Sequence, residues 1–413
     1  MKEIEGGVCA PAGFSAGGIR CGIKASSQKR DLALIYSDRP GKSAAVFTSN
    51  QVKAAGVLLT KEHLAAGGIR GVIINSGNAN ACTGEAGLAA ARRMAELAAE
   101  KISCSCQPAL PEQVAVASTG VIGVPLPIER IEAGMDDLIA SCCAAPEGND
   151  AAAEAIMTTD TRKKTAAVEF EIRGKPVRIG AMVKGSGMIH PNMATLLGVF
   201  TTDAALRGQA LETSFRQAVG RSFNRLSVDG DTSTNDMILV MANGAAENSP
   251  IKEGSAEYEI FSAALESLCV KLVRELARDG EGASRLLTVT VNGAATEEDA
   301  AALARSVVSS NLVKAAIFGA DANWGRVLSA LGSAGPALDP AAVSLRFAGP
   351  LGEIAVCRGG VALPFDEAEA KRLLLSEEVG ILVDIEGGGT GRASAWGCDL
   401  SYDYVKINGD YRT

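Results

Sequence analysis

The segment from Lys184 to Thr195 contains residue types that could form a nucleophilic site. It reads KGSGMIHPNMAT, so a glycine-rich stretch with one proline leads directly into an apolar run that opens with Thr195. A threonine hydroxyl becomes a nucleophile when an adjacent base takes its proton. The same pattern also fits an ordinary strand start, because threonine is β-branched and favours strands. From residue types and spacing alone, the ordinary strand start is the favoured interpretation.

General bases are scarce in this chain, because only two histidines occur, His63 and His190. Histidine is the side chain most often used for proton transfer in catalysis. If the chain is an enzyme, we expect its base to be a different group. The ten cysteines include no CxxC pair, so their spacing favours neither a structural metal site nor a disulfide framework. Reduced, mostly buried thiols are the favoured interpretation.

Four further segments resemble known motifs but each fails a positional test. Gly13–Gly17 fits GxSxG but has no strand before it, and 36–43 has a tyrosine where a P-loop needs its first glycine. In 229–240, threonine and valine occupy two positions that a calcium loop requires. Gly387–Arg392 ends in arginine instead of the last glycine of a dinucleotide loop, and it is predicted to be a hairpin turn.

Short apolar runs alternate with helical patterns along the chain, which predicts a mixed α/β protein. Strands are expected at Asp31–Tyr36, Gly71–Asn75, Val114–Ser118, Ala166–Ile172, Pro176–Val183, Thr195–Thr201, Met237–Ala242, Arg285–Val291 and Gly380–Ile385. Helices are expected at Gly84–Lys101, Ile128–Ala140, Ala205–Leu226, Ala256–Ala277 and Glu297–Val308.

Composition limits the class of partner. The 413 residues carry a net charge of −8 without a basic cluster, which argues against nucleic acid or an anionic membrane as a main partner. No apolar run approaches the roughly 20 residues of a membrane span, and the N-terminus lacks the apolar core of a signal peptide. A cytoplasmic location is therefore expected. The length suggests two or three domains.

The order and spacing of eight segments resemble the ornithine acetyltransferase family over essentially the whole chain. The segments are Lys184–Thr195, Asn75–Gly84 (NSGNANACTG), Ala117–Gly123 (ASTGVIG), Ile156–Thr161 (IMTTDT), Ser222–Asp236 (SFNRLSVDGDTSTND), Asp279–Ala283 (DGEGA), Gly319–Arg326 (GADANWGR) and Ser401–Thr413 (SYDYVKINGDYRT). One departure is Lys163, where the family commonly has proline.

The resemblance implies that Thr195 cleaves its own chain. Its hydroxyl would attack the carbonyl carbon of Ala194, and hydrolysis of the resulting ester would leave fragments 1–194 and 195–413. The new α-amine of Thr195 would then serve as the base for its hydroxyl, since its reference pKa of about 7.7–8.0 suits neutral pH. This mechanism needs no histidine.

The resemblance also implies an activity and a site. Acetyl would pass from N-acetylornithine to Thr195 and then to glutamate, in arginine biosynthesis, with Thr119 and Gly120 as the oxyanion hole. The substrate contacts would be Thr158, Lys184, Thr195, Glu281, Asn408 and Thr413. From their charges, Lys184 is expected to hold the α-carboxylate of the substrate, and Glu281, together with the C-terminal carboxylate, an ammonium group.

The implied fold is a layered α+β sandwich of the N-terminal-nucleophile type with a smaller C-terminal α/β domain. A boundary is expected near Gly280–Ser284, where a long predicted helix ends in a glycine-rich turn, which gives a main domain of residues 1–284 and a smaller one of 285–413. The implied assembly is a heterotetramer of two copies of each fragment, with neither cofactor nor metal. Two alternatives remain open. The enzyme could take acetyl from acetyl-CoA, or it could be a self-processing aminopeptidase or amidase in which water accepts the acyl group.

Overall fold

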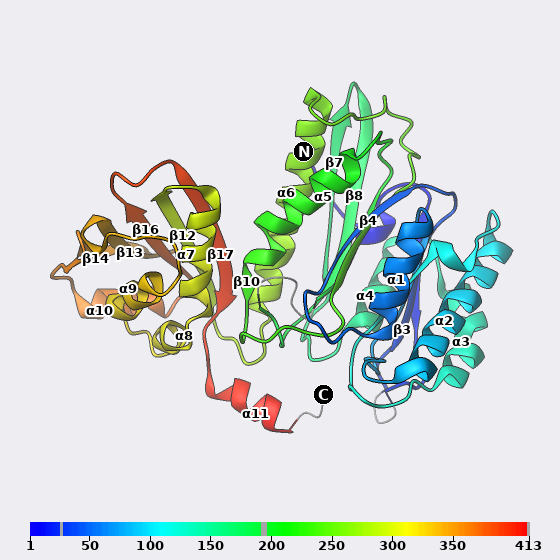
Figure 1. Cartoon of the computed structure of the whole chain (residues 1–413), viewed down its shortest axis with the longest axis horizontal. Coiled ribbons are helices and arrows are strands. Elements are labelled where there is room, and N and C mark those ends of the chain that lie inside the picture. The colour runs from blue at the N-terminus through cyan, green and yellow to red at the C-terminus, as the bar shows by residue number, and fades with distance from the viewer. Residues whose placement is uncertain (25–27, 191–195, 411–413) are drawn as a thin grey trace.

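The computed structural model describes residues 1–24, 28–190 and 196–410, and the strands in those ranges form three sheets. A six-stranded and a four-stranded sheet lie in the larger part of the molecule, and a seven-stranded sheet lies in the part on the left of Figure 1. Helices cover the sheets, so the predicted mixed α/β (α+β) class is confirmed.

The six-stranded sheet is assembled from distant parts of the chain. Across the sheet its strands are β1 (Lys2–Ile4), β7 (Lys164–Ile172), β8 (Lys175–Lys184), β9 (Leu197–Thr202), β11 (Met237–Ala242) and β4 (Lys42–Phe47). β9 pairs antiparallel with β8 and parallel with β11, and β4 pairs antiparallel with β11. The two strands that follow residue 195 are therefore flanked on both sides by strands that precede it.

The four-stranded sheet packs face to face on the six-stranded sheet. Its strands are β2 (Phe14–Ile19), β3 (Leu32–Ser37), β5 (Gly71–Asn75) and β6 (Val114–Ser118). Side chains alternate between the faces of a strand, and β3 shows the consequence. Ala33 and Ile35 join the core shared by the two sheets, whereas Leu32 and Leu34 join the core under the outer helices.

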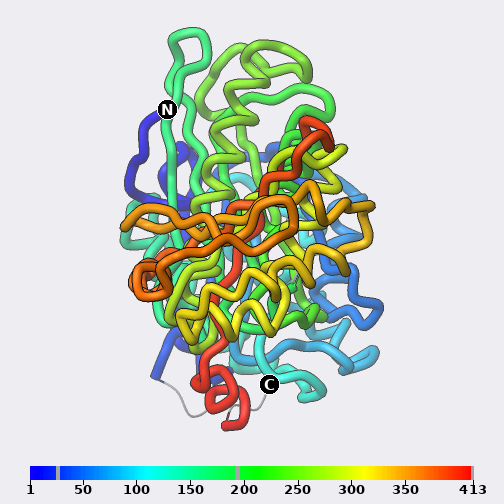
Figure 2. The backbone as a smooth tube through the Cα atoms, turned by 90° about the vertical axis from the view of Figure 1, so that its left-hand side faces the viewer, coloured from blue at the N-terminus to red at the C-terminus, as the bar shows by residue number. Residues whose placement is uncertain are grey.

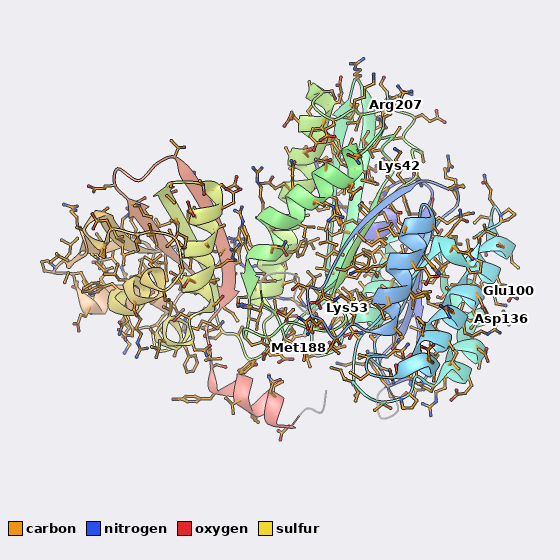
Figure 3. All side chains as sticks on the ribbon, viewed as in Figure 1. Lys42, Lys53, Glu100, Asp136, Met188 and Arg207 are labelled. Carbon is orange, nitrogen blue, oxygen red and sulfur yellow. The ribbon has the colours of Figure 1, made fainter. Side chains whose placement is uncertain are left out.

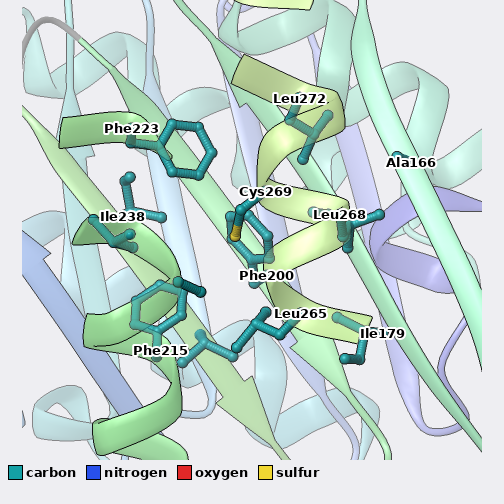
Figure 4. Packing of buried hydrophobic residues seen from close by; sticks show 14 of the residues in the cluster. Ala166, Ile179, Phe200, Phe215, Phe223, Ile238, Leu265, Leu268, Cys269 and Leu272 are labelled. Carbon is teal, nitrogen blue, oxygen red and sulfur yellow. The ribbon is translucent and has the colours of Figure 1, made fainter. Parts of the chain in front are cut away.

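Helices complete the sandwich on both sides. On the four-stranded sheet lie α1 (Ala55–Ala66), α2 (Gly84–Ser105) and α3 (Ile128–Ser141), while α4 (Pro146–Ile156) contributes to the core between the sheets. On the six-stranded sheet lie α5 (Ala210–Arg221) and α6 (Ala256–Arg278). In that layer Phe200 packs edge to face against Phe215 and Phe223, with ring centroids 5.7 and 6.1 Å away, beside Leu265 and Cys269 of α6 (Figure 4).

The seven-stranded sheet has its own apolar core, formed by residues between Leu287 and Ala395. Its strands are β10 (Leu226–Ser227), β17 (Gly391–Cys398), β12 (Leu286–Ala294), β16 (Glu378–Ile385), β13 (Val343–Gly349), β14 (Gly352–Arg358) and β15 (Val361–Ala362). Its helices are α7 (Glu297–Ser309), α8 (Asn311–Phe318), α9 (Trp324–Gly332) and α10 (Glu367–Leu374), and Figure 2 views this part face on. The last helix, α11 (Tyr402–Asp410), lies at the lower edge in Figure 1.

Two local predictions were wrong. The hairpin expected at Gly387–Arg392 does not form, because β12 lies between β16 and β17 in the sheet. The helix expected at Ala205–Leu226 is shorter, since Gly208 has a left-handed φ of +61° before it and a 3₁₀ turn and β10 follow it. Short 3₁₀ helices occur at Gly7–Cys9, Pro111–Gln113, Phe223–Arg225 and Pro340–Ala342.

The cysteines and the helices bear on two further predictions. All ten cysteines are free, but four are buried, so the expectation of mostly buried thiols was too broad.

No single described helix is long and apolar enough to cross a membrane, although the bent pair α7 and α8 passes that test by length and composition. The predicted boundary between 284 and 285 remains a prediction.

Candidate active site

One cavity collects residues from loops that are distant in the sequence. It is lined by Thr119, Gly120, Ile122, Thr158, Thr159, Lys184, Gly187, Met188, Ser233, Asn235, Glu281 and Asn408. Met188, which Figure 3 labels, lies at the end of the molecule that also carries α11. The lining combines two side chains of opposite formal charge, Lys184 and Glu281, with several hydroxyl and amide groups.

The structure brings together most of the site residues that the sequence predicted. Those that line the cavity are Thr119, Gly120, Thr158, Lys184, Glu281 and Asn408. Ala194, Thr195 and Thr413 lie outside the described residues. The chemical role of each residue remains a prediction.

The Thr119–Gly120 turn follows β6 and is held by the end of β5 and the loop that follows it. The Thr119 N–H donates to the carbonyl of Asn75 at 3.0 Å, and the Asn75 side chain donates to the Ser118 hydroxyl at 2.7 Å. Gly120 has φ +132°, and a Cβ there would lie 2.6 Å from the carbonyl carbon of Gly77. Only glycine fits this close approach, which leaves the backbone beside the cavity unshielded.

Asn235 connects this turn to the segment before β11. Its side-chain nitrogen donates to the carbonyls of Ala79 at 2.6 Å and Ser118 at 2.8 Å. Asn235 is buried and lines the cavity. Ser118 ends β6 directly before Thr119 and Gly120, and Ala79 lies in the loop that follows β5, so Asn235 fixes both segments relative to β11.

Lys184, at the end of β8, is a buried cation beside the cavity. It is 2% exposed, and its ammonium group has no carboxylate within 4.0 Å among the described residues. Its one hydrogen bond there is donated to the Thr119 hydroxyl at 3.5 Å. Burial lowers the pKa of Lys184, and the charge of Lys164 adds to this, while Asp160, Asp236 and Glu281 oppose it.

Glu281 also lines the cavity and is held by α11. Its Oε2 accepts a hydrogen bond from the Asn408 side chain at 2.8 Å, and its N–H donates to the carbonyl of Ser186 at 2.8 Å. The hydroxyl of Tyr404 donates to Asp229 at 3.3 Å. The last described helix thus contributes directly to the cavity wall.

Asp236 lies directly before β11 and is fully buried. Its Oδ1 accepts the N–H of Leu196 at 3.0 Å, whereas its Oδ2 has no hydrogen-bond partner within the described part of the chain. Burial raises the pKa of Asp236 well above its usual range, although the Leu196 N–H, the charge of Lys184 and the side chain of Ser233 act against this. A buried oxygen without a partner favours the protonated carboxyl.

Neither histidine lines the cavity. His63 is buried on α1, with its Nδ1 2.8 Å from the carbonyl of Val114. His190 lies 3.2 Å from the Ser227 hydroxyl, and burial lowers its pKa. In the ranges that the structure describes, no group of His, Cys, Asp or Glu is arranged to hold a metal ion.

Several residues of the site were missed by sequence reasoning. Asn235 and Asp236 belong to one of the segments that carry the family resemblance, and Asp160 and Asp279 to two others, but none was singled out. Their signal was present in those segments. Their burial, and with it their role, depends on contacts between segments far apart in the chain.

Comparison with known proteins identifies relatives over the full length. The model of the ArgJ family matches residues 15–413. The "Arginine biosynthesis bifunctional protein ArgJ" of Symbiobacterium thermophilum is 54% identical over 414 residues, covering 100% of both chains. The protein of the same name in Bacillus subtilis is 45% identical over 415 residues, covering 100% of this chain and 98% of its own.

A solved structure is also similar. The ornithine acetyltransferase of Mycobacterium tuberculosis, solved in complex with ornithine, is 42% identical in sequence. The match covers 46% of this chain and 95% of that chain, with a TM-score of 0.42. The full-length relatives and the family model confirm the resemblance that the motifs predicted.

Proposed function

The chain belongs to the ArgJ family, and on that premise we propose that it is a self-cleaving acyltransferase of arginine biosynthesis that moves acetyl from N-acetylornithine to glutamate. The observation that carries the proposal is the cavity, in which six residues predicted from five separate motifs lie together. An enzyme that transfers acetyl between amino acids must bind a carboxylate, an ammonium group and a tetrahedral oxyanion, and this cavity offers a group for each.

Self-cleavage is the first step of the proposal. The Thr195 hydroxyl adds to the carbonyl carbon of Ala194, the peptide C–N bond breaks, and the proton passes to the new α-amine. Water then hydrolyses the Ala194–Thr195 ester. The strand order supports fragments that stay together, because β9 and β11 are flanked by β8 and β4 of the other fragment.

Acetyl transfer then takes place in two half-reactions. The α-amine of Thr195 removes the hydroxyl proton as the oxygen attacks the acetyl carbonyl, and ornithine leaves with that proton on its amine. The amine of glutamate attacks the acetyl-threonine ester in the second half-reaction and regenerates the hydroxyl. In both, the rigid Thr119–Gly120 turn supports the developing oxyanion.

The two charged residues of the cavity suggest how substrates are oriented. Lys184 is buried without a carboxylate partner in the described residues, so a substrate α-carboxylate would complete its environment. Glu281 suits the side-chain ammonium of an ornithine derivative. Glutamate and N-acetylornithine share the α-carboxylate, which lets one lysine serve both half-reactions.

The remaining partner assignments are part of the same proposal. No bound cofactor is needed, and acetyl-CoA would enter, if it is used, as an alternative acetyl donor. The working form would be a cytoplasmic heterotetramer with two copies of each fragment. Neither nucleic acid nor a membrane is required as a partner.

The test compares the wild type with Thr195→Ala. The wild type should give two bands on a denaturing gel, the second beginning Thr-Leu-Leu-Gly-Val, and should form N-acetylglutamate from N-acetylornithine and glutamate. Thr195→Ala should remain one chain and lose more than about 10³-fold in kcat/KM, because a nucleophile has no substitute. Acetate release at an equal rate without glutamate would instead identify a hydrolase. Acetyl transfer from acetyl-CoA but not from N-acetylornithine would show that acetyl-CoA is the donor.

A further inference from the structure

A buried cluster of charges lies beside the cavity and includes residues not assigned above. Its centre is Lys164, the first residue of β7, whose ammonium group binds Asp160 Oδ1 at 2.6 Å and Asp279 Oδ2 at 2.5 Å. The side chains are 0%, 0% and 3% exposed, respectively. Burying three charges is costly unless each is paired and hydrogen-bonded, so the remaining contacts of the cluster decide what it does.

Each carboxylate of the cluster also binds the backbone of a cavity wall. Asp160 accepts the N–H of Thr158 at 3.0 Å through Oδ2 and that of Gly185 at 2.8 Å through Oδ1. It therefore connects the loop of one predicted substrate contact, Thr158, to the residue that follows another, Lys184. Charge-assisted hydrogen bonds of this kind are among the strongest in proteins.

Asp279 extends the cluster to the third wall. Its side chain accepts the N–H of Thr161 at 3.1 Å, and its carbonyl accepts the Ser186 hydroxyl at 2.7 Å. The carbonyl of Ser186 in turn accepts the N–H of Glu281 at 2.8 Å. One ammonium group thus joins the three segments that present Thr158, Lys184 and Glu281.

Lys184, Lys164 and Lys24 interact electrostatically with Asp160, and of these three only Lys164 forms an ion pair with it. Burial raises the pKa of Asp160, and the charges of Lys184 and Lys164 outweigh this and hold the pKa well below its usual range. Asp160 is therefore an anion close enough to act on Lys184. If Lys164 were removed, Lys184 would be the buried cation left to compensate it.

We propose that Lys164 is a positioning residue that holds Asp160 and Asp279 in place and thereby leaves the ammonium group of Lys184 free to bind a substrate carboxylate. Lys164 does not line the cavity, so it acts through the other residues. Loss of its charge should let Asp160 pair with Lys184, and the cavity should then discriminate poorly between ligands with and without an α-carboxylate. The proposal rests on the proposed function only for the identity of the substrate.

The test uses equilibrium binding, which does not depend on turnover. The probes are ornithine and 1,4-diaminobutane, which is ornithine without its carboxylate, titrated calorimetrically into the full protein. Lys164→Met should weaken ornithine binding by about tenfold or more, as expected for losing a charge-assisted contact. Binding of 1,4-diaminobutane should change by less than about threefold, because it makes no carboxylate contact.

Lys163→Met is the matched control. Lys163 is next in the chain and is exposed, and its ammonium group pairs with Asp150 at 2.7 Å outside the cavity. This variant should bind both probes like the wild type. The double variant with Lys164→Met and Asp160→Asn removes the carboxylate that would capture Lys184, and it should regain at least about half of the lost ornithine affinity on a logarithmic scale. If Lys164→Met alone folds poorly, the binding measurements are made on the double variant instead.

The outcomes separate the two proposals. Equal weakening of both probes by Lys164→Met, or no recovery in the double variant, would overturn the positioning role and leave a structural one. If the Lys164→Met and double variants gave the expected binding results but the wild type transferred no acetyl group, the proposed function would fail while the role of Lys164 stood. Acetyl transfer by the wild type, together with unchanged ornithine binding in Lys164→Met, would support the proposed function and overturn the role of Lys164.

Discussion

The two-sheet sandwich and the seven-stranded part use the same kinds of elements but bury charge very differently. From residue 287 to 395, all of which the structure describes, Lys314 is the one buried side chain with a formal charge. Around the cavity, by contrast, Lys164, Lys184, Asp160, Asp236, Asp279 and Glu281 are all buried.

This difference shows where the fold accepts a cost in stability. Buried charges lose hydration, and even paired ones add little net stability compared with apolar side chains. The seven-stranded part avoids that cost and relies on apolar packing. The sandwich also buries Asp31, Arg70 and Asp203 elsewhere, but it gathers most of its buried charges around the cavity, where segments from both sides of residue 195 meet, as expected for a functional site.

The largest effect on stability is expected from removing one aromatic ring from each region. Phe200→Ala and Phe347→Ala each delete a buried ring and should destabilise their own region by about 3–5 kcal/mol. Calorimetry in the uncleaved Thr195→Ala background avoids the concentration dependence of separate fragments. Phe347→Ala should lower a transition that Phe200→Ala leaves in place.

The same pair of variants tests the predicted boundary near residue 284. In the cleaved enzyme, Phe347→Ala should change kcat/KM by less than about twofold at about 25 °C, because its core is separate from the cavity. A single transition lowered equally by both substitutions would show that the regions unfold as one unit. Phe347→Leu, which keeps most of the volume, should cost less than about 1.5 kcal/mol.

An intermediate effect is expected from the two buried lysines that differ in surroundings. Lys184→Met should lower kcat/KM by about 10- to 100-fold, the loss of one charge-assisted contact, without lowering the free energy of unfolding. Lys314 donates to the carbonyl of Cys398, so Lys314→Met should destabilise by about 1–3 kcal/mol with kcat/KM unchanged. Activity assays and urea unfolding of both variants test this expectation. A loss of stability without a loss of kcat/KM in Lys184→Met, or the opposite in Lys314→Met, would contradict it.

The smallest effect concerns pH. Burial raises the pKa of Asp236, so the native state binds its proton more tightly than the unfolded chain, and the free energy of unfolding falls as pH rises above about 3.9. Asp236→Asn has no carboxyl to ionise, so its free energy of unfolding does not fall in this way. Measured by urea unfolding, its free energy of unfolding relative to the wild type should increase between about pH 4 and pH 8.

Asp160→Asn provides a control of opposite sign. Burial raises the pKa of Asp160, but the charges of Lys184 and Lys164 lower it by more, so the net pKa lies below its usual range. The ionised carboxylate therefore stabilises the fold above about pH 3.9, and this stabilisation is lost as pH falls through the native pKa. Asp160→Asn should therefore be most destabilised at neutral pH and approach the wild type in acid. Parallel pH profiles for the two variants would contradict one of the two assignments, and the sign of the shared slope would show which.

Much of the fold could be predicted from local patterns. β5, β6 and β11 begin and end at the predicted residues, and α2 and α3 begin where expected, because apolar periodicity reports which face of a strand or helix is buried. The pairing of strands was not local. β12 lies between β16 and β17 although residues 386–390 join those two strands directly, because pairing is decided by packing in the whole sheet.

The site divides in the same way. The ordered motifs indicated Thr119, Gly120, Lys184 and Glu281, and the structure places these residues around one cavity. Sequence by itself determined the family, the residue types and the scarcity of histidine. It did not reveal that Lys164 lies 2.5 Å from Asp279, 115 positions away in the chain.

Only the tertiary structure decided which charges are buried and which of them are paired. An isolated lysine or aspartate in a sequence is ordinarily solvated, and its effect changes only when the fold removes water and brings an opposite charge within hydrogen-bonding distance. Lys164 and Lys184 are the same residue type at the two ends of one hairpin, β7 and β8. Their different partners give one a structural pair and leave the other facing the cavity.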